Sequence, residues 1–239
     1  MKKILICSPT YNESENITEF CKRIFNIKKK VDLLIIDDNS PDGTSNIVQK
    51  LIKKKKKKKK KKLILIKRKS KLGIGSAFRI GIKYAIENKY NTLVTLDADL
   101  SHQPEEIPKL LLKLKKNDFV IGSRYISGGK SNYTGYRSIV SKAANIACRI
   151  LLNINLHEFT TSFRAYNANC LKTLYYLPVL SEGYSSFMET VFYISKENLK
   201  YGEVPIIFKD RYKGKSKIPK LQILYGGLKL FEFFLKRFT

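Results

Sequence analysis

Two carboxylates, Asp97 and Asp99, stand two positions apart directly after the apolar run 92–96. Alternate positions of an extended segment point to the same side, so both acids face one way. Like charges this close repel each other unless a cation lies between them or water surrounds both. Carboxylate oxygens suit Mg²⁺ or Mn²⁺, which takes one or two carboxylates together with substrate phosphates. A helix cap explains Asp99 but not Asp97, so the pair favours a divalent metal site.

Two further polar segments follow apolar runs. Pro9-Thr10-Tyr11-Asn12-Glu13 comes after Ile4–Cys7, and its proline, ring and carboxylate are suited to hold a planar base and its ribose. Taken alone, a turn and a helix cap explain this segment better. Asp37 and Asp38 end the apolar run 31–36, where a turn explains only the residues that follow them. Acids in that position often accept hydrogen bonds from a ribose or a base.

The remaining candidates are cationic. They are Arg124, Arg137, Arg164 and the segment 210–217, which reads Asp-Arg-Tyr-Lys-Gly-Lys-Ser-Lys. Guanidinium groups bind phosphate bidentately. In so basic a chain, any one of these cationic residues is explained as surface charge. Only their occurrence together with the acidic pair indicates a phosphorylated ligand. The Gly-x-Gly of Lys71–Gly75 is expected to be a loop–helix junction.

The elements that must position these residues are an alternation of strands and helices. Strands are predicted at 4–7, 31–36, 63–66, 92–96 and 119–121, and apolar residues at helical spacing predict helices between them and over 104–114. This order predicts an α/β fold with a mostly parallel central sheet and helices on both faces. Ligands of such sheets bind beyond the carboxyl ends of the strands, where the polar segments lie. The second half is less regular, apart from an apolar stripe over 218–239.

The composition limits the class of protein. The chain has 239 residues, which fits one large domain, and 47 Lys and Arg against 20 Asp and Glu leave a net charge of +27. Ten lysines form the run 53–62, which we expect to be a solvated low-complexity insertion. The charge suggests an anionic partner: nucleic acid, a membrane surface or a phosphorylated substrate. Four scattered cysteines indicate reduced thiols rather than a zinc site or disulfides, and no apolar run reaches the ~18 residues that span a membrane.

The segments PTYNE, IDDNSPDGT, LDADLSHQP, GSRY, FTTSFRAY, GYSSFMET and EVPIIFKDRYKGKSK occur in this order. Together they resemble the dolichyl-phosphate mannosyltransferases, inverting glycosyltransferases of family 2 with a GT-A fold. The resemblance implies metal-dependent transfer of mannose from GDP-mannose to dolichyl phosphate, giving a β-D-mannosyl phosphate for GPI-anchor, N-glycan and O- and C-mannosylation pathways. It also implies a peripheral enzyme on the cytosolic face of the endoplasmic reticulum membrane. The catalytic domain would cover 1–217, and 218–239 would form an amphipathic C-terminal helix.

The resemblance also implies residue roles. The GDP-mannose site would comprise Pro9, Tyr11, Glu13, Ile36 and Asp38 for the guanosine, Asp97, Ala98 and Asp99 for the nucleotide-sugar, and Arg124, Arg211 and Lys217 for the diphosphate or the acceptor phosphate. Asp97 and Asp99 would bind Mg²⁺ or Mn²⁺, joined by Ser101 through its hydroxyl or a water, and Asp97, Asp99 and Arg124 would be catalytic. Arg137 and Arg164 would meet the acceptor phosphate. Thr161 stands where the family usually has glycine, so the backbone of that loop is expected to differ from the usual family shape.

Alternatives remain open on these residues. The C-terminal helix either lies in the membrane interface with Lys220, Lys229, Lys236 and Arg237 near headgroups, packs on its own domain, or docks a small membrane subunit. Transfer of glucose from UDP-glucose to the same lipid is the nearest alternative reaction. A nucleic-acid-binding protein that uses the lysine run would bind with a steep salt dependence, but the acidic pairs oppose such a partner.

Overall fold

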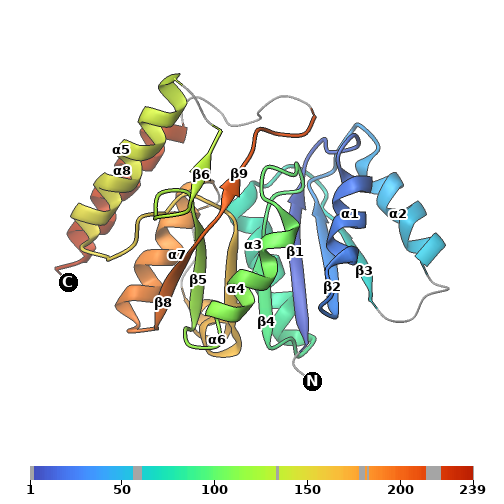
Figure 1. Ribbon diagram of the computed structural model, residues 1–239, viewed down its shortest axis with the longest axis horizontal. Coiled ribbons are helices and arrows are strands. Elements are labelled where there is room, and N and C mark those ends of the chain that lie inside the picture. Colours follow the sequence, from blue (N-terminus) through green and yellow to red (C-terminus); the bar gives the residue numbers. More distant parts are fainter. Residues whose placement is uncertain are drawn as a thin grey trace.

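The computed structural model describes residues 3–55, 61–132, 135–177, 181, 183–213 and 222–238. A seven-stranded sheet runs through these residues in the order β3-β2-β1-β4-β7-β5-β8 (Figure 1). Its strands are β1 (Ile4–Thr10), β2 (Val31–Asp37), β3 (Leu63–Lys67), β4 (Thr92–Thr95), β5 (Phe119–Ser123), β7 (Arg164–Asn167) and β8 (Tyr201–Pro205). Only β7 is antiparallel to its neighbours, so the predicted mostly parallel sheet is confirmed. A small second sheet pairs β6 (Lys130–Ser131) with β9 (Ile207–Phe208).

Helices cover both faces of the large sheet, as predicted (Figure 1). One face carries α1 (Ile17–Asn26), α2 (Thr44–Lys55) and α4 (Ile107–Lys113), the last entered through a short 3₁₀ turn (Pro104–Glu106). The other face carries α3 (Ile74–Glu87), α6 (Ala168–Tyr176) and α7 (Ser185–Lys196). At one end of the molecule α5 (Gly135–Leu152) and α8 (Gln222–Lys236) lie side by side.

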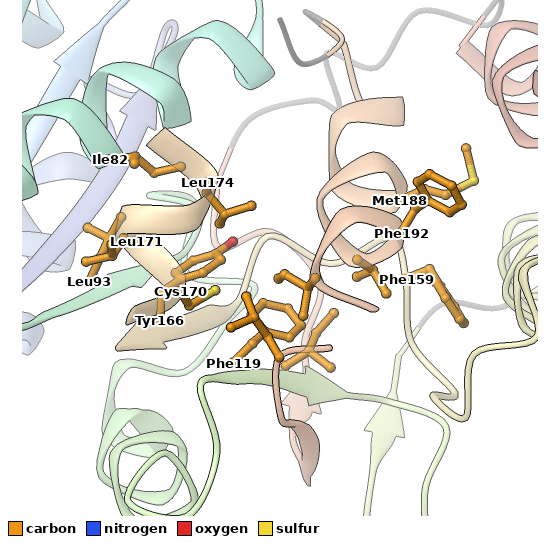
Figure 2. Close-up of a cluster of buried hydrophobic side chains, with 14 of the residues drawn as sticks. Ile82, Leu93, Phe119, Phe159, Tyr166, Cys170, Leu171, Leu174, Met188 and Phe192 are labelled. Atoms are coloured by element: carbon orange, nitrogen blue, oxygen red, sulfur yellow. The ribbon is translucent and has the colours of Figure 1, made fainter. Parts of the chain in front are cut away.

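The period of two along each strand divides the core between these faces. In β1, Leu5 and Cys7 face the cluster under α3, α6 and α7, while Ile6 faces the cluster under α1 and α4. Figure 2 shows the first cluster, where Phe119 and Tyr166 pack with their ring centroids 5.2 Å apart. Because both faces of the sheet are buried, the central strands are continuous apolar runs in the sequence. Such runs are what made these strands predictable.

The structure describes both ends of the lysine run, which we expect to be a solvated low-complexity insertion. Helix α2 continues through Lys55, so the run begins inside a helix. Residues 56–60 lie outside the described residues. At the far end, Lys61 Nζ donates hydrogen bonds to the carbonyls of Phe25 and Ile27, at 2.8 and 2.6 Å.

Helix α8 packs on its own domain and also presents an apolar outer face. Phe233 is fully buried and stacks on Phe192 of α7, with ring centroids 5.1 Å apart. The apolar stripe noted in the sequence lies on the opposite side: Leu228, Phe231, Leu235 and Phe238 are each more than half exposed. No helix within the described ranges is long and apolar enough to cross a membrane.

Candidate functional site

The predicted site residues gather at one edge of the sheet. Strands β2, β1 and β4 are parallel neighbours, so the segments that follow them leave the sheet at the same edge. The loop after β4 carries Asp97 and Asp99. Its turn is made by Leu100, which has a φ of +64°. A left-handed conformation is unusual for a bulky residue, and such outliers cluster where function constrains the backbone.

Asp99 is held from two sides. Its Oδ1 accepts hydrogen bonds from the Ser101 backbone N–H at 3.0 Å and from the Ser101 hydroxyl at 2.6 Å. Its Oδ2 lies 3.1 Å from Nη2 of Arg211. Ser101 is itself buried, and its hydroxyl orients the Asp99 carboxylate. The hydroxyl is therefore not exposed to a ligand.

Arg211 joins the acidic loop to the segment after β1. Its Nη1 donates to Oε1 of Glu13 at 2.7 Å, and Asn16 Nδ2 donates to the other Glu13 oxygen at 2.7 Å. The chain around Arg211 is fixed by its backbone, because the N–H groups of Lys209 and Tyr212 donate to the carbonyls of Ser101 and Asp99, both at 3.0 Å. The structure thus brings together three predicted ligand-binding residues, Glu13, Asp99 and Arg211.

Asp97 is the accessible member of the acidic pair, with about a third of its side chain exposed. Burial and then the charge of Asp99 raise the pKa of Asp97 to about 7. His102 lies beneath it, with Nδ1 3.5 Å from the Asp97 amide and Nε2 2.8 Å from the Thr161 hydroxyl. Burial lowers the pKa of His102 to about 4, so this imidazole is neutral at pH 7.

The donor atoms at this edge fit a divalent cation that also binds a substrate. Within the described part of the chain, no three His, Cys, Asp or Glu side chains are arranged to hold a metal by themselves. Asp97 and Asp99 supply two hard carboxylates, the number that Mg²⁺ or Mn²⁺ commonly takes before phosphates and waters complete its shell. Arg211 already lies against one of them, which shows that the cluster accepts positive charge.

The residues predicted for the guanosine differ in their accessibility. Tyr11 is half-buried at this edge, with Lys71 Nζ 4.4 Å from its ring centroid. Asp38 is buried and forms an ion pair with Arg68. Burial raises the pKa of Asp38, and this effect outweighs the lowering by the Arg68 hydrogen bond and charge.

Two other residues predicted for the donor have buried side chains. Ile36 is fully buried and its side chain packs in the core, so only its backbone, which is paired with Pro9 of the neighbouring strand, remains for a ligand. The Ala98 side chain is likewise buried in the core.

Arg124 is engaged by a buried acid. Its Nε and Nη2 donate to the two Glu158 oxygens at 2.7 and 2.9 Å, and Nη2 also donates to the Thr160 hydroxyl at 2.9 Å. Burial alone would raise the pKa of Glu158, but the charge and hydrogen bonds of Arg124 outweigh it and hold that pKa below its usual value. Phe208 packs between this pair and the acidic loop, with its ring 5.2 Å from Arg124 Cζ and 5.1 Å from the His102 ring.

Three other predicted residues have different outcomes. Arg164 is fully buried, and its three guanidinium nitrogens donate to the carbonyls of Thr161, Phe187 and Phe159 at 2.7–2.8 Å. The structure therefore contradicts our assignment of Arg164 to the acceptor phosphate, because its donors serve the backbone of the loop instead. Arg137 lies in the first turn of α5, but its side chain is outside the described residues, as is all of Lys217.

Sequence reasoning missed Arg68, Asn16 and Glu158 as parts of this edge. Arg68 follows strand β3 directly, but in a chain with 47 basic residues its position alone does not distinguish it from surface charge. Glu158 and Asn16 carried no signal either, since each lies away from a strand end and is recognised only by the partner that folding brings to it.

Comparison with known proteins shows which family has this sequence. The family model described as glycosyl transferase family 2 matches residues 5–175. An undecaprenyl-phosphate mannosyltransferase of Micrococcus luteus is 35% identical over 90% of this chain and 87% of its own length. A polyprenol monophosphomannose synthase of Mycolicibacterium smegmatis is 34% identical over 97% of this chain and 86% of its own.

Solved structures share the fold at low identity. A Pyrobaculum calidifontis mannosyltransferase in complex with GDP-Man and Mn²⁺ aligns with a TM-score of 0.61 and 15% identity over 99% of this chain, which spans 63% of that chain. Glucosyl-3-phosphoglycerate synthase from Mycobacterium tuberculosis aligns with a TM-score of 0.66 and 18% identity, covering 99% of this chain and 80% of that one. The GT-A architecture is thereby confirmed. From the family match and the two curated relatives, the chain belongs to glycosyl transferase family 2.

Proposed function

We propose that this protein transfers mannose from GDP-mannose to the phosphate of a polyprenyl phosphate, with a divalent metal and with inversion at the anomeric carbon. The observation that carries the proposal is the cluster of Asp97, Asp99, Glu13 and Arg211 at the carboxyl edge of the sheet. The two mannosyltransferase relatives support the sugar and the acceptor. The GDP-Man and Mn²⁺ bound by the Pyrobaculum enzyme support the donor and the metal.

In this proposal, the residues of the chain align the donor. Pro9, Tyr11, Glu13 and Asp38 hold the guanosine, with the Ile36 backbone beside Pro9. Asp97, Ala98 and Asp99 meet the nucleotide-sugar, and Ser101 fixes the Asp99 carboxylate through its hydroxyl and its amide. A bound Mg²⁺ or Mn²⁺ would neutralise charge on the diphosphate that leaves. Arg211 and, beyond the described residues, Lys217 add positive charge to the same group.

The reaction requires no strong general base. An oxygen of the acceptor phosphate is already ionised at neutral pH, so it attacks the anomeric carbon directly while the bond from that carbon to GDP breaks. His102, the histidine of the acidic loop, is buried, neutral at pH 7 and packed against the Phe163 ring at 5.3 Å. What the chain must supply is alignment of two anions and compensation of their charge, for which Arg124 and Arg137 are the proposed groups on the acceptor side.

The outer face of α5 and α8 is suited to the lipid part of the acceptor. On α5, Tyr136, Ile139, Ile146 and Ile150 are exposed, and on α8 the stripe from Leu228 to Phe238 is exposed beside them. Lys142, Arg149, Lys229, Lys236 and Arg237 lie on the same two helices or at their ends. An apolar face bordered by cations is typical of segments that lie in a membrane interface. We propose that this face rests on the membrane. The family resemblance implies dolichyl phosphate as the acceptor and the cytosolic face of the endoplasmic reticulum as the location.

The proposal is tested by a transfer assay with purified protein. Dolichyl phosphate and undecaprenyl phosphate are each offered with GDP-mannose and, in parallel, with UDP-glucose, with Mn²⁺, Mg²⁺ or a chelator. Mannosyl-lipid formation that needs GDP-mannose and ceases with chelator supports the proposal, and the better acceptor identifies the lipid. Glucosyl-lipid formation from UDP-glucose would overturn the donor, and transfer undiminished by the chelator would overturn the metal.

A further inference from the structure

Arg68 is buried and uses every nitrogen of its side chain. Its Nε and Nη2 contact the Asp38 carboxylate, Nη1 donates to the Ser76 hydroxyl at 2.5 Å, and Nη2 also donates to the Gly73 carbonyl at 2.9 Å. Its backbone N–H donates to the Asp37 carbonyl at 2.8 Å. One side chain at the end of β3 therefore joins the end of β2, the loop that follows Arg68 and the first turn of α3.

The loop that Arg68 holds lies against the proposed nucleoside site. Lys71 is in this loop, and its ammonium group lies over the Tyr11 ring. Gly73 turns the chain with a φ of +86°, a conformation that glycine adopts without strain. The backbone N–H groups of Leu72 and Gly73 also stabilise the charged Asp38 carboxylate. The carboxylate and the loop are thus fixed with respect to each other, and Arg68 links them through its contacts with Asp38 and the Gly73 carbonyl.

We propose that Arg68 is a positioning residue for the nucleobase of the donor. This inference rests on the proposed function, because it takes Asp38 and Tyr11 to be the residues that meet the base. Arg68 orients Asp38 as a hydrogen-bond acceptor and holds the loop whose Lys71 ammonium, over the Tyr11 ring, is the donor. An acceptor next to a donor matches a base that presents an N–H beside a carbonyl, as guanine and uracil do. Adenine presents the opposite pattern there, so the arrangement rejects it.

The number and spread of these contacts explain why an arginine is needed. The planar guanidinium contacts Oδ1 of Asp38 through Nε and Nη2 while it also reaches Ser76 and Gly73, whereas a lysine ammonium is a point charge that could not make all these contacts at once. A glutamine removes the charge altogether. The series Arg68→Lys and Arg68→Gln therefore separates charge from orientation. Arg79 is an exposed arginine on the same helix α3 that Arg68 contacts, so Arg79→Gln is the matched control.

The test measures affinities for GDP, UDP and ADP by calorimetry in the presence of Mn²⁺. We expect the wild type to bind its preferred nucleotide at least about tenfold more tightly than ADP, the effect of one hydrogen bond to a charged group. Arg68→Gln should bring this ratio close to one, Arg68→Lys should give an intermediate ratio, and Arg79→Gln should leave it unchanged. If Arg68 had a purely structural role, Arg68→Gln would weaken the binding of all three nucleotides by the same factor. An unchanged ratio of the affinities for the preferred nucleotide and ADP in this variant therefore overturns the inference.

Two further measurements separate a loss of base preference from a loss of folding, and a wrong donor from a wrong role of Arg68. Arg68→Gln leaves Asp38 buried without its cation, so the double variant Asp38→Asn/Arg68→Gln, which removes both charges, is measured beside it. We expect the double variant to melt close to the wild type and still to bind without base preference, and retained preference would contradict the inference. If the wild type prefers UDP to GDP, the proposed donor is wrong, while the ratio of UDP to ADP still tests Arg68.

Discussion

Nη2 of Arg211 lies 3.1 Å from Oδ2 of Asp99, on the loop that carries the acidic pair. The same guanidinium donates to Glu13, a residue 198 positions away in the chain. Desolvation alone would lower the pKa of Arg211, but the charges of Asp99 and Glu13 outweigh it and raise that pKa above its usual value. A cation from the chain itself therefore occupies the acidic cluster that we propose for the metal and the diphosphate.

Removal of this arginine should affect the two ligands in opposite directions. In Arg211→Ala, three carboxylates lose their cation, so Mn²⁺ should bind about tenfold more tightly in the absence of nucleotide. GDP-mannose should bind more weakly, because its diphosphate loses a positive partner. Mn²⁺ titration followed by electron paramagnetic resonance, with and without GDP-mannose, measures both effects. Unchanged Mn²⁺ affinity in the nucleotide-free variant would show that Arg211 does not compete with the metal.

Metal binding should depend on pH through Asp97. Its raised pKa, about 7, means that the carboxyl group is largely protonated below that pH and must lose its proton to bind a cation. Mn²⁺ affinity should therefore rise between pH 6 and pH 8. In Asp97→Asn the affinity should be low and its dependence on pH should flatten over this range. A wild-type affinity that stays constant from pH 6 to pH 8 would contradict the assignment of Asp97 as a ligand.

The buried pair of Arg124 and Glu158 should dominate the stability of its region. Glu158→Gln leaves Arg124 buried without a counter-charge, which costs about 3 kcal/mol. Because the pKa of Glu158 is lowered in the folded state, its contribution is complete above the unfolded pKa of about 4.3 and is lost as the pH falls through the lower folded value. Urea unfolding of both proteins at pH 7 and at pH 3 measures this. A difference as large at pH 3 as at pH 7 would contradict the charged pair.

The two faces of α8 should respond differently to substitution. Leu228→Glu with Phe231→Glu should reduce co-sedimentation with anionic liposomes by about tenfold or more while leaving the melting temperature nearly unchanged, because both side chains are exposed. Phe233→Ala removes a buried ring and should destabilise the fold by about 3–5 kcal/mol. Equal liposome binding by the Glu variant and the wild type would support α8 as a helix that serves only its own domain.

The first half of the fold was predictable because its signals are local. Five apolar runs gave strands at their correct starts, and the acids that follow β2 and β4 marked the carboxyl edge. The antiparallel strand β7 was missed because it reads Arg-Ala-Tyr-Asn, too short and too polar for an apolar run, and is defined by its pairing with β4 and β5. Helices α5, α6 and α7 were missed for a related reason, since their buried residues face partners from distant parts of the chain.

Within the site, acids were easier to place than arginines. An acid at the end of an apolar strand is costly without a purpose, so Asp38, Asp97 and Asp99 stood out. An arginine is ambiguous in a chain with 47 basic residues. Arg164 was assigned to a phosphate and instead serves backbone carbonyls, while Arg68 was overlooked and holds Asp38. Only the folded contacts distinguish these roles.

The central claim is that a divalent cation joins Asp97 and Asp99 to the diphosphate of the donor. Its most direct measurement is anomalous diffraction at the manganese edge from crystals grown with GDP-mannose and Mn²⁺. The account predicts one strong anomalous peak within coordination distance of both carboxylates and of the diphosphate oxygens. A peak elsewhere, or a diphosphate bound away from the loop between β4 and α4, would contradict it.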